Sequence, residues 1–327
     1  MLITSHSQVY LKLENLQPSG SFKSRGIGQM MLSSLRTLSS PNSASTSPVH
    51  FYCSSGGNAG LACAHAAISL KHPATIVVPI LTSALMITKI KALGDSIQVV
   101  VHGASWFDAD EYMRKELLAN DPGGVYIPPF DHPEVWKGNS TMIEEIYADI
   151  GGFDGVICSV GGGGLFNGIV QGLAELPFET KVLAVETRGG DCLFQSLKMG
   201  RSVRLDGITT IATSLGAVQV SNKTFELASG EYGRTVDSLV FDDAAAVEAC
   251  AKFLDEERFL VEPACGVSLA PVYRDNLRTT IFGKDSVTGD WNGDEEWTTK
   301  KIVVVVCGGS NITAGILESY KDRFGVK

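Results

Sequence analysis

The chain has 327 residues, which is longer than a single hydrophobic core usually grows, so two domains or one large α/β unit are expected. Its 44% hydrophobic and 19% charged residues are typical of a globular protein and argue against a disordered or fibrous chain. A formal net charge of −9 without any block of Lys and Arg argues against a nucleic-acid partner, and no apolar run approaches the roughly 20 residues of a membrane-spanning helix. The seven cysteines form no CxxC pair and the first residues lack the pattern of a secretion signal, so a cytoplasmic protein is expected.

Strand-like and helix-like segments alternate along the chain. The first predicted strand is 9–13, and the first predicted helix, 24–36, follows it after a short loop. Further strands are predicted at 50–53, 75–78, 97–101, 156–160, 182–186 and 301–307. Helices are predicted between them at 59–70, 85–93, 106–120, 164–174 and 244–254. This alternation is typical of βαβ units around parallel sheets, so the predicted fold class is α/β.

A lysine lies between the first predicted strand and the first predicted helix, in the segment Gln17-Pro-Ser-Gly-Ser-Phe-Lys23-Ser-Arg-Gly26. Proline and small residues favour a tight turn, which would deliver Lys23 to the first turn of the helix. The positive end of a helix and partial burial both lower the pKa of an amine, as an amine nucleophile requires. By itself the pattern also suits a solvated surface lysine, which is the more common case.

A second segment, Cys53-Ser-Ser-Gly-Gly-Asn-Ala-Gly60, lies between a predicted strand and an alanine-rich predicted helix. Hydroxyl groups, backbone N–H groups and a helix N-terminus together suit an anion such as a carboxylate. A plain capping turn explains the serines and the asparagine equally well.

The third segment, Ser159-Val-Gly161-Gly-Gly-Gly164-Leu-Phe-Asn-Gly168, places four consecutive glycines between an apolar strand and a helix. Such glycines let backbone N–H groups close around a phosphate, although a close-packed strand–helix turn is an alternative. No register gives G-x-G-x-x-G, and Ile169 stands where a P-loop needs lysine. A dinucleotide site with Glu186 as the ribose-binding acid therefore remains only as a weaker hypothesis.

The fourth segment, Val303-Val-Val-Val-Cys307-Gly-Gly-Ser310-Asn311, is a strand that opens into a glycine turn. Ligands of open parallel sheets bind beyond the carboxyl ends of the strands, so Cys307 and Ser310 would face the same crevice as the other loops. The four segments are far more specific together than any of them alone. An amine nucleophile combined with a phosphate-binding loop indicates pyridoxal phosphate.

These segments resemble the type II fold of pyridoxal-phosphate enzymes, and among them the eukaryotic cytosolic L-serine/L-threonine dehydratases. The resemblance covers nearly the whole chain and includes Tyr126-Ile-Pro-Pro-Phe130 and Val261-Glu-Pro-Ala-Cys-Gly266. It implies two open parallel-sheet domains, as in the tryptophan synthase β subunit: a small domain at 18–129 and a large cofactor-binding domain made of 1–17 and 130–327. It also implies a homodimer, with no nucleic-acid or membrane partner.

The resemblance further implies a role for each site residue. Lys23 would bind the cofactor covalently, and Phe22 would pack against its ring. The substrate carboxylate would be held by the second segment, at Ser54, Ser55, Gly56 and Asn58, with Asn58 also reaching the ring hydroxyl of the cofactor. The phosphate would be bound by Gly161, Gly162, Gly163 and Gly164. Cys307 would lie against the pyridine nitrogen, with Ser310 also contacting the cofactor.

The implied reaction is a β-elimination that converts L-serine to pyruvate and L-threonine to 2-oxobutanoate, each with ammonia, in amino-acid catabolism. The freed Lys23 would remove the Cα proton, and the phosphate would assist loss of the β-hydroxyl. A thiol at Cys307 donates a proton poorly, which favours elimination over transamination and racemisation. Asn58-Ala-Gly differs from the corresponding loops of biosynthetic threonine deaminases, serine racemases and cysteine synthases. Another lyase or racemase of this fold, and an NAD-dependent oxidoreductase, are the alternatives.

A monovalent cation, K⁺, is the last ligand that the resemblance implies. Its ligands would be Glu186 together with Gly161, Gly190, Leu215 and Ala217. Relatives offer a serine hydroxyl where this chain has Cys192, and a soft thiol is a poor ligand for potassium. The chain also starts without the segment, including Thr-Pro-Leu, that family members usually carry ahead of the first strand, and its absence is expected to weaken dimer packing.

Overall fold

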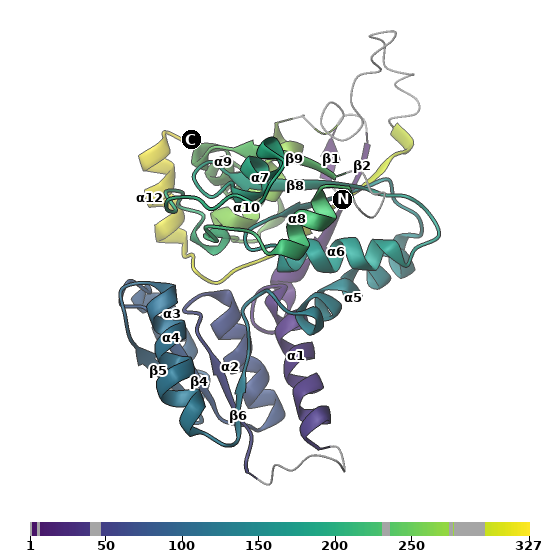
Figure 1. Cartoon of the computed structure of the whole chain (residues 1–327). Coiled ribbons are helices and arrows are strands. Elements are labelled where there is room, and N and C mark those ends of the chain that lie inside the picture. The colour runs from purple at the N-terminus through teal and green to yellow at the C-terminus, as the bar shows by residue number, and fades with distance from the viewer. Residues whose placement is uncertain (1, 5–6, 40–46, 231–235, 275–276, 278–297) are drawn as a thin grey trace. The chain divides into compact units, whose positions relative to one another are not determined.

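The computed structural model describes residues 2–4, 7–39, 47–230, 236–274, 277 and 298–327 (Figure 1). The chain divides into two compact units, a larger one made of Met1–Asn15 with Ser140–Lys327 and a smaller one, Leu16–Asn139. Each unit contains a sheet of mainly parallel strands, so the predicted α/β class with two parallel sheets is confirmed. In the described part of the chain, no helix is long and apolar enough to cross a membrane.

The larger unit is built on a six-stranded sheet in the order β1-β2-β10-β7-β8-β9. Strand β1 pairs antiparallel with β2, whereas the other neighbouring pairs are parallel. The central strands β7 and β10 read as continuous apolar runs because helices cover parallel sheets and leave their strands buried. The strands are β1 (Leu2–Thr4), β2 (Ser7–Leu13), β7 (Gly155–Ser159), β8 (Lys181–Thr187), β9 (Val236–Phe241) and β10 (Lys301–Val306).

Helix α10 (Pro263–Tyr273) lies against strands β7, β8 and β10 and packs on helix α9 (Asp243–Glu257). Pro263 starts α10 at a position where its missing N–H costs nothing, and the helix is buried along most of its length. The hydroxyl of Ser268, inside this apolar environment, donates to the carbonyl oxygens of Cys265 and Val305. The remaining helices of the larger unit are α6 (Gly164–Ala174), α7 (Cys192–Met199), α8 (Asn222–Ala228) and α12 (Ala314–Phe324), with the short turn η4 (Thr213–Leu215).

The smaller unit has a four-stranded parallel sheet in the order β5-β4-β3-β6. Its strands are β3 (His50–Cys53), β4 (Ala74–Val78), β5 (Ile97–Val101) and β6 (Gly124–Tyr126). Its helices are α1 (Lys23–Leu38), α2 (Asn58–Leu70), α3 (Ala84–Lys91) and α4 (Trp106–Tyr112), and α4 continues into a π-helical turn, η2 (Met113–Leu117), and a 3-10 turn, η3 (Leu118–Asn120). Helix α5 (Pro133–Ile150) belongs to the smaller unit up to residue 139 and to the larger unit from residue 140, and η1 (Glu14–Leu16) joins the units in the same way.

Alternate residues of strand β3 point to two separate cores. Phe51 and Cys53 join the larger core, which α1, α2 and α3 cover, whereas Tyr52 points to the opposite face of the sheet. There Tyr52 packs with Ala109 of α4 and Met113 of η2. The sheet is therefore covered on both faces, and its carboxyl edge, where the β3 and β6 loops lie, is left for ligands.

Strands expected from apolar runs match the observed strands closely. Those at 50–53 and 97–101 have the observed bounds, and the helix at 164–174 does too. The helix expected at 106–120 is present but is divided into α4, η2 and η3. Elements absent from the prediction are β1, β6, β9, α5, α7, α8, α10 and α12.

Candidate active site

Lys23 is the first residue of helix α1, and its amine is fixed by a backbone carbonyl. The preceding chain turns at Gly20, where φ is +76°, and the hydroxyls of Ser19 and Ser24 lie 2.7 Å apart across that turn. The Nζ of Lys23 donates to the carbonyl oxygen of Pro129 at 2.6 Å. Pro129 lies in the loop between β6 and α5, so the turn and this loop together set the position of the amine.

Two glycines let α1 approach the start of α5 closely enough to hold this arrangement. A Cβ on Gly26 would lie 2.6 Å from the carbonyl oxygen of Val135, and a Cβ on Gly138 would lie 2.4 Å from that of Arg25. Both contacts are shorter than real Cβ atoms allow, so any side chain at either position would force the helices apart. The spacing of Lys23 from the β6–α5 loop depends on these two residues.

The second predicted segment is the loop between β3 and α2. Gly56 lies against Thr82, and Gly60 lies so close to the carbonyl oxygen of Ser55 that its Cβ would be 1.8 Å from it. Asn58 begins helix α2 and is largely buried, and the backbone N–H of Gly57 donates to the Oγ of Ser55. The loop is thus folded tightly onto the N-terminus of a 13-residue helix, a geometry that suits a bound carboxylate.

Ser54 is fully buried, and its hydroxyl donates to Oδ1 of Asp110 at 2.6 Å. The phenol of Tyr126 donates to the same oxygen at 3.0 Å. Sequence reasoning did not find Asp110, because it lies 56 positions away from Ser54 and in a helix with no motif of its own.

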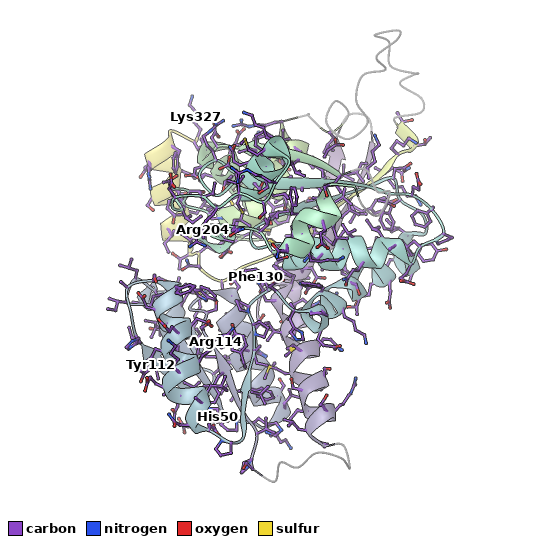
Figure 2. All side chains as sticks on the ribbon, in the orientation of Figure 1. His50, Tyr112, Arg114, Phe130, Arg204 and Lys327 are labelled. Atoms are coloured by element: carbon purple, nitrogen blue, oxygen red, sulfur yellow. The ribbon has the colours of Figure 1, made fainter. Side chains whose placement is uncertain are left out.

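The smaller unit also holds a cavity of about 510 Å³ beside Pro129, the residue whose carbonyl oxygen accepts from Lys23. It is lined by Pro129 and Phe130 of the β6–α5 loop and by Arg114 and Tyr126, together with Met30, Trp106, Pro128, Asp131 and His132. Arg114 and Phe130 are labelled in Figure 2. Most of this lining is apolar, and its polar groups come from a few side chains, which is typical of small-molecule sites.

In the larger unit, the glycine loop follows β7 and leads into α6. Gly163, at the N-cap of α6, has a φ of +99°, and a Cβ there would lie 1.8 Å from Oγ1 of Thr224. The carbonyl oxygen of Gly162 accepts from the backbone N–H of Ser221, so the N–H of the same peptide, on Gly163, points the opposite way. The N-cap has no side chain that could cap the helix, which leaves its positive end available for an anion.

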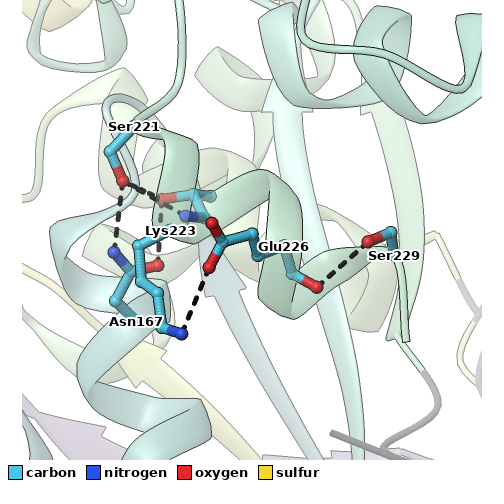
Figure 3. Close-up of polar contacts among 6 residues, drawn as sticks. Asn167, Ser221, Lys223, Glu226 and Ser229 are labelled. Atoms are coloured by element: carbon cyan, nitrogen blue, oxygen red, sulfur yellow. Dashed lines mark hydrogen bonds and ion pairs between the residues drawn. The ribbon is translucent and has the colours of Figure 1, made fainter. Parts of the chain in front are cut away.

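A closed ring of three hydrogen bonds holds this loop against helix α8 (Figure 3). Thr224 Oγ1 donates to Asn167 Oδ1 at 2.9 Å, and Asn167 Nδ2 donates to Ser221 Oγ at 3.3 Å. Because the single hydroxyl proton of Thr224 is used on Asn167, Ser221 must donate to Thr224 across their 2.8 Å contact. All three side chains are buried, and such a satisfied ring fixes the glycine loop rigidly.

The ring was not predicted, although part of its signal was in the sequence. Ser221 caps α8 by accepting from the backbone N–H of Thr224, a common N-terminal pattern for serine. Asn167 is a polar residue within the apolar helix α6. Its partners on α8 could not be identified without the fold.

Cys307 directly follows strand β10, and its thiol lies 3.5 Å from the hydroxyl of Ser159, at the end of the neighbouring strand β7. Its thiol also contacts the carbonyl oxygens of Ala264 and Gly308. Burial raises the pKa of the adjacent Cys158 and Cys265 thiols, so both thiols keep their protons.

The turn after Cys307 is braced by Glu262. Gly309 has a φ of +130°, and a Cβ there would lie 2.1 Å from the carboxyl carbon of Glu262. The backbone N–H of Asn311 donates to the Glu262 carboxylate at 3.2 Å, so Ser310 is held between two fixed residues. Glu262 therefore supports the backbone of this turn.

Glu186 is completely buried at the end of β8, and its two oxygens accept from the backbone N–H groups of Leu193 and Phe194 at the start of α7. Burial raises the pKa of Glu186 to about 8, although these two hydrogen bonds favour the charged form. A fully buried carboxylate held this way is not available to a ribose, which removes the main support for a dinucleotide site.

The other predicted cation ligands lie nearby in the larger unit. The Cα of Leu215 is 3.0 Å from where a Cβ on Gly161 would be, and the thiol of Cys192 contacts the carbonyl oxygen of Gly161. Burial, together with the nearby Glu186, raises the pKa of Cys192 to about 12. In the described part of the chain, no group of three or more His, Cys, Asp and Glu side chains could hold a metal ion.

These residues fit pyridoxal phosphate. The glycine loop offers an uncapped helix end whose backbone leaves no room for side chains, as a phosphate site requires. The amine of Lys23 donates to the carbonyl oxygen of Pro129, and the Cys307 thiol lies beside the hydroxyl of Ser159 at the carboxyl edge of its sheet. Lys23 and the 54–58 loop belong to the smaller unit, and the glycine loop and Cys307 belong to the larger one.

The chain was compared with known proteins. The model of the pyridoxal-phosphate dependent enzyme family matches residues 3–289. The catabolic L-serine/threonine dehydratase of Saccharomyces cerevisiae is 38% identical over 98% of this chain and 88% of its own length, and the human L-serine dehydratase/L-threonine deaminase is 39% identical over 98% and 91%.

Solved structures agree with this similarity. A fungal L-serine ammonia-lyase from Rhizomucor miehei superposes with a TM-score of 0.82 at 33% identity, covering 97% of this chain and 93% of that chain. Maize serine racemase superposes with a TM-score of 0.78 at 25% identity, covering 97% and 87%. The chain therefore belongs to the pyridoxal-phosphate dependent enzymes and, within them, to the L-serine/L-threonine dehydratase family.

Proposed function

We propose that this protein is a pyridoxal-phosphate-dependent ammonia-lyase that converts L-serine to pyruvate and L-threonine to 2-oxobutanoate, each with release of ammonia. The observation that carries the proposal is the amine of Lys23, held 2.6 Å from the carbonyl oxygen of Pro129 at the start of α1. The relatives named above, whose printed names give serine and threonine as substrates, supply the substrate class.

Each part of the site has a role in this reaction. Lys23 would hold the cofactor through its amine, and the same amine, when free, would accept the proton of the substrate Cα. When bound, the cofactor supplies an electron-withdrawing ring that stabilises negative charge at that carbon. Phe22 would pack on the ring, and the glycine loop with Ser310 would hold the phosphate end.

The substrate is oriented by its carboxylate. Ser55, the backbone of Gly56 and the N-terminus of α2 at Asn58 bind that group, which places Cα toward the Lys23 amine. The thiol of Cys307 would be a poor proton donor to the ring nitrogen of the cofactor, which would favour loss of the β-hydroxyl over transamination or racemisation. Another lyase or racemase of the same fold is the alternative that this feature disfavours.

The test is a product assay on the enzyme loaded with pyridoxal phosphate. Ketoacid and ammonia should form in equal amounts from L-serine and from L-threonine, and Lys23→Ala should abolish both products. Lys91→Ala, which removes an exposed lysine of α3, should leave both rates unchanged. Formation of D-serine without ketoacid would instead identify a racemase, and no turnover of either amino acid would refute the proposal.

The proposal includes a K⁺ site formed by Glu186 with the backbone of Gly161, Gly190, Leu215 and Ala217. Support comes from the buried Glu186 carboxylate and from Thr187, whose buried hydroxyl has no hydrogen-bond partner and lies next to Gly190. A hard oxygen ligand at Thr187 would offset the soft thiol of Cys192. Replacing K⁺ with tetramethylammonium should lower the thermal midpoint of the wild-type enzyme but not that of Glu186→Gln.

The remaining parts of the proposal concern the whole protein. The smaller unit, Leu16–Asn139, acts as the small domain that was expected at 18–129, and the larger unit acts as the large cofactor-binding domain that was expected at 1–17 and 130–327. The enzyme works in the cytoplasm as a homodimer in amino-acid catabolism, without nucleic-acid or membrane partners. Light scattering on the eluting protein measures its mass, and a monomer at working concentration would contradict the dimer.

A further inference from the structure

The carboxylate of Asp110, on helix α4, accepts hydrogen bonds from three other elements of the smaller unit. Its Oδ1 accepts from Ser54 at 2.6 Å and from Tyr126 at 3.0 Å, and its Oδ2 accepts from Nε of Arg114 at 2.8 Å. Ser54 begins the 54–58 loop, Tyr126 ends strand β6, and Arg114 lies in the π-helical turn η2. The side chain of Asp110 is only 13% exposed, whereas that of Arg114 is 50% exposed, so the contacts of Asp110 with Ser54 and Tyr126 form the inner part of the cluster.

All three partners donate, so the carboxyl group of Asp110 is their common acceptor. The guanidinium of Arg114 lies 3.9 Å from the centre of the Tyr126 ring, which adds a second contact between two of the donors. Burial and the negative charge of Asp110 raise the pKa of Tyr126, so the phenol keeps its proton and remains a donor. The cluster therefore joins α4 to η2, to β6 and to the 54–58 loop.

The cluster also links two parts of the candidate site. Arg114 and Tyr126 line the 510 Å³ cavity together with Pro129, the residue whose carbonyl oxygen holds the Lys23 amine. On its other side, the cluster holds Ser54, the residue at which β3 turns into the 54–58 loop. A π-helical turn such as η2 is frequent at functional sites and is otherwise rare.

We propose that Asp110 is a positioning residue for this enzyme, which fixes Ser54 and so holds the 54–58 loop in the conformation that binds the substrate carboxylate. The hydroxyl proton of Ser54 is used on Asp110, so Ser54 acts on the substrate through the loop backbone and not by direct contact. This inference rests on the role proposed above for the 54–58 loop.

Three variants separate this role from general stability. Asp110→Ala removes all three acceptor contacts, whereas Asp110→Asn keeps one oxygen for Ser54 and Tyr126 and places an NH₂ group against Arg114. Ser54→Ala removes only the contact to the loop. Glu111→Gln is the matched control, because Glu111 lies on the same helix and makes an exposed ion pair with Lys115.

Two readouts do not depend on turnover. Backbone hydrogen exchange at residues 55–58 in the purified protein reports the order of the loop, and it should accelerate in Asp110→Ala and Ser54→Ala but not in Glu111→Gln. Free glycine, which has an amine and a carboxylate but no β-hydroxyl, can be titrated against the visible spectrum of the loaded enzyme. Its apparent Kd should rise about tenfold or more in Asp110→Ala, as expected for loss of a charge-assisted contact, and less in Asp110→Asn.

With L-serine, KM should rise in the same proportion while kcat changes much less. The reason is that the contact with the substrate carboxylate stabilises the bound substrate and the transition state equally. The double variant with Asp110→Ala and Ser54→Ala should bind glycine no more weakly than Asp110→Ala alone, since both substitutions remove the same contact. Unchanged exchange and unchanged glycine binding in Asp110→Ala and Ser54→Ala, with thermal midpoints near that of the wild type, would overturn the inference. A wild-type enzyme that binds glycine but forms no ketoacid would refute the proposed function and leave this test of Asp110 intact.

Discussion

Replacing Gly163 with alanine tests the glycine loop at its most constrained point. The residue has a φ of +99°, and its Cβ would lie 1.8 Å from Oγ1 and 2.6 Å from both Cβ and Cγ2 of Thr224. Rotating the Thr224 side chain cannot relieve the contact, because the Thr224 Cβ does not move with that rotation. Either the loop or helix α8 must shift, and the ring that joins Asn167, Ser221 and Thr224 must open.

The expected cost has two parts. A left-handed backbone costs a non-glycine residue about 1–2 kcal/mol, and leaving buried members of the ring without partners costs about 1–3 kcal/mol each. Gly200→Ala is the matched control, because Gly200 also has a positive φ, +63°, but nothing within 4 Å of a Cβ. For a unit of this size, each kcal/mol of lost stability lowers the thermal midpoint by about 2–4 °C. Gly163→Ala should therefore lower the thermal midpoint by at least about twice as much as Gly200→Ala does.

Circular dichroism melts of the two variants without cofactor measure the stability part. Titration with pyridoxal phosphate, followed by visible absorption, measures the functional part. Cofactor affinity should drop at least about tenfold in Gly163→Ala, equivalent to about 1.4 kcal/mol, and stay unchanged in Gly200→Ala. Equal melting temperatures with equal cofactor affinities would refute the account of this loop.

Two further predictions concern the larger unit. Thr224→Val should lower the free energy of unfolding by about 1–3 kcal/mol because it opens the ring, whereas Thr224→Ser keeps the hydroxyl and should lower it less. Urea titration of both variants measures these two losses. Equal losses would show that the hydroxyl is unimportant. Burial raises the pKa of Glu186 from 4.5 to about 8, so the folded protein holds a proton that the unfolded chain releases between these pH values. Without K⁺ or Na⁺, stability should therefore fall as the pH rises through about 8, by at most about 1.4 kcal/mol per pH unit, and Glu186→Gln should remove that slope; parallel pH profiles of the two proteins would contradict it.

The sequence predicted the central strands well because strands buried on both faces read as unbroken apolar runs, as Val303–Val306 does. Strand β6 was missed because it has only three residues and lies at the edge of its sheet. Helix α5 was missed because Gly138, Asn139 and Ser140 look like a turn in the sequence. In the fold, position 138 requires glycine because α1 passes too close to it for any side chain.

The candidate site was predictable where it consists of contiguous segments. Glycines and hydroxyl-bearing residues after a predicted strand identify each of these segments: the lysine turn, the 54–58 loop, the glycine loop and the Cys307 turn. The contacts of their supporting partners were not predictable, because Pro129, Asp110 and Thr224 lie far away in the chain from the residues that they contact. Pro129 lies in the segment Tyr126-Ile-Pro-Pro-Phe130 that carries part of the resemblance, but its contact with Lys23 could not be read from that segment. Long-range contacts of this kind carry no local pattern, so only the fold reveals them.

The central claim is that Lys23 carries the cofactor, and chemical mapping tests it most directly. Sodium borohydride reduces the bond between pyridoxal phosphate and a lysine amine to a permanent one, and peptide mass spectrometry then identifies the modified residue. The account predicts that the modification lies on Lys23 alone, and that Lys23→Ala loses both the label and the visible absorption band. A label on any other lysine, or a protein that takes up no cofactor, would contradict it.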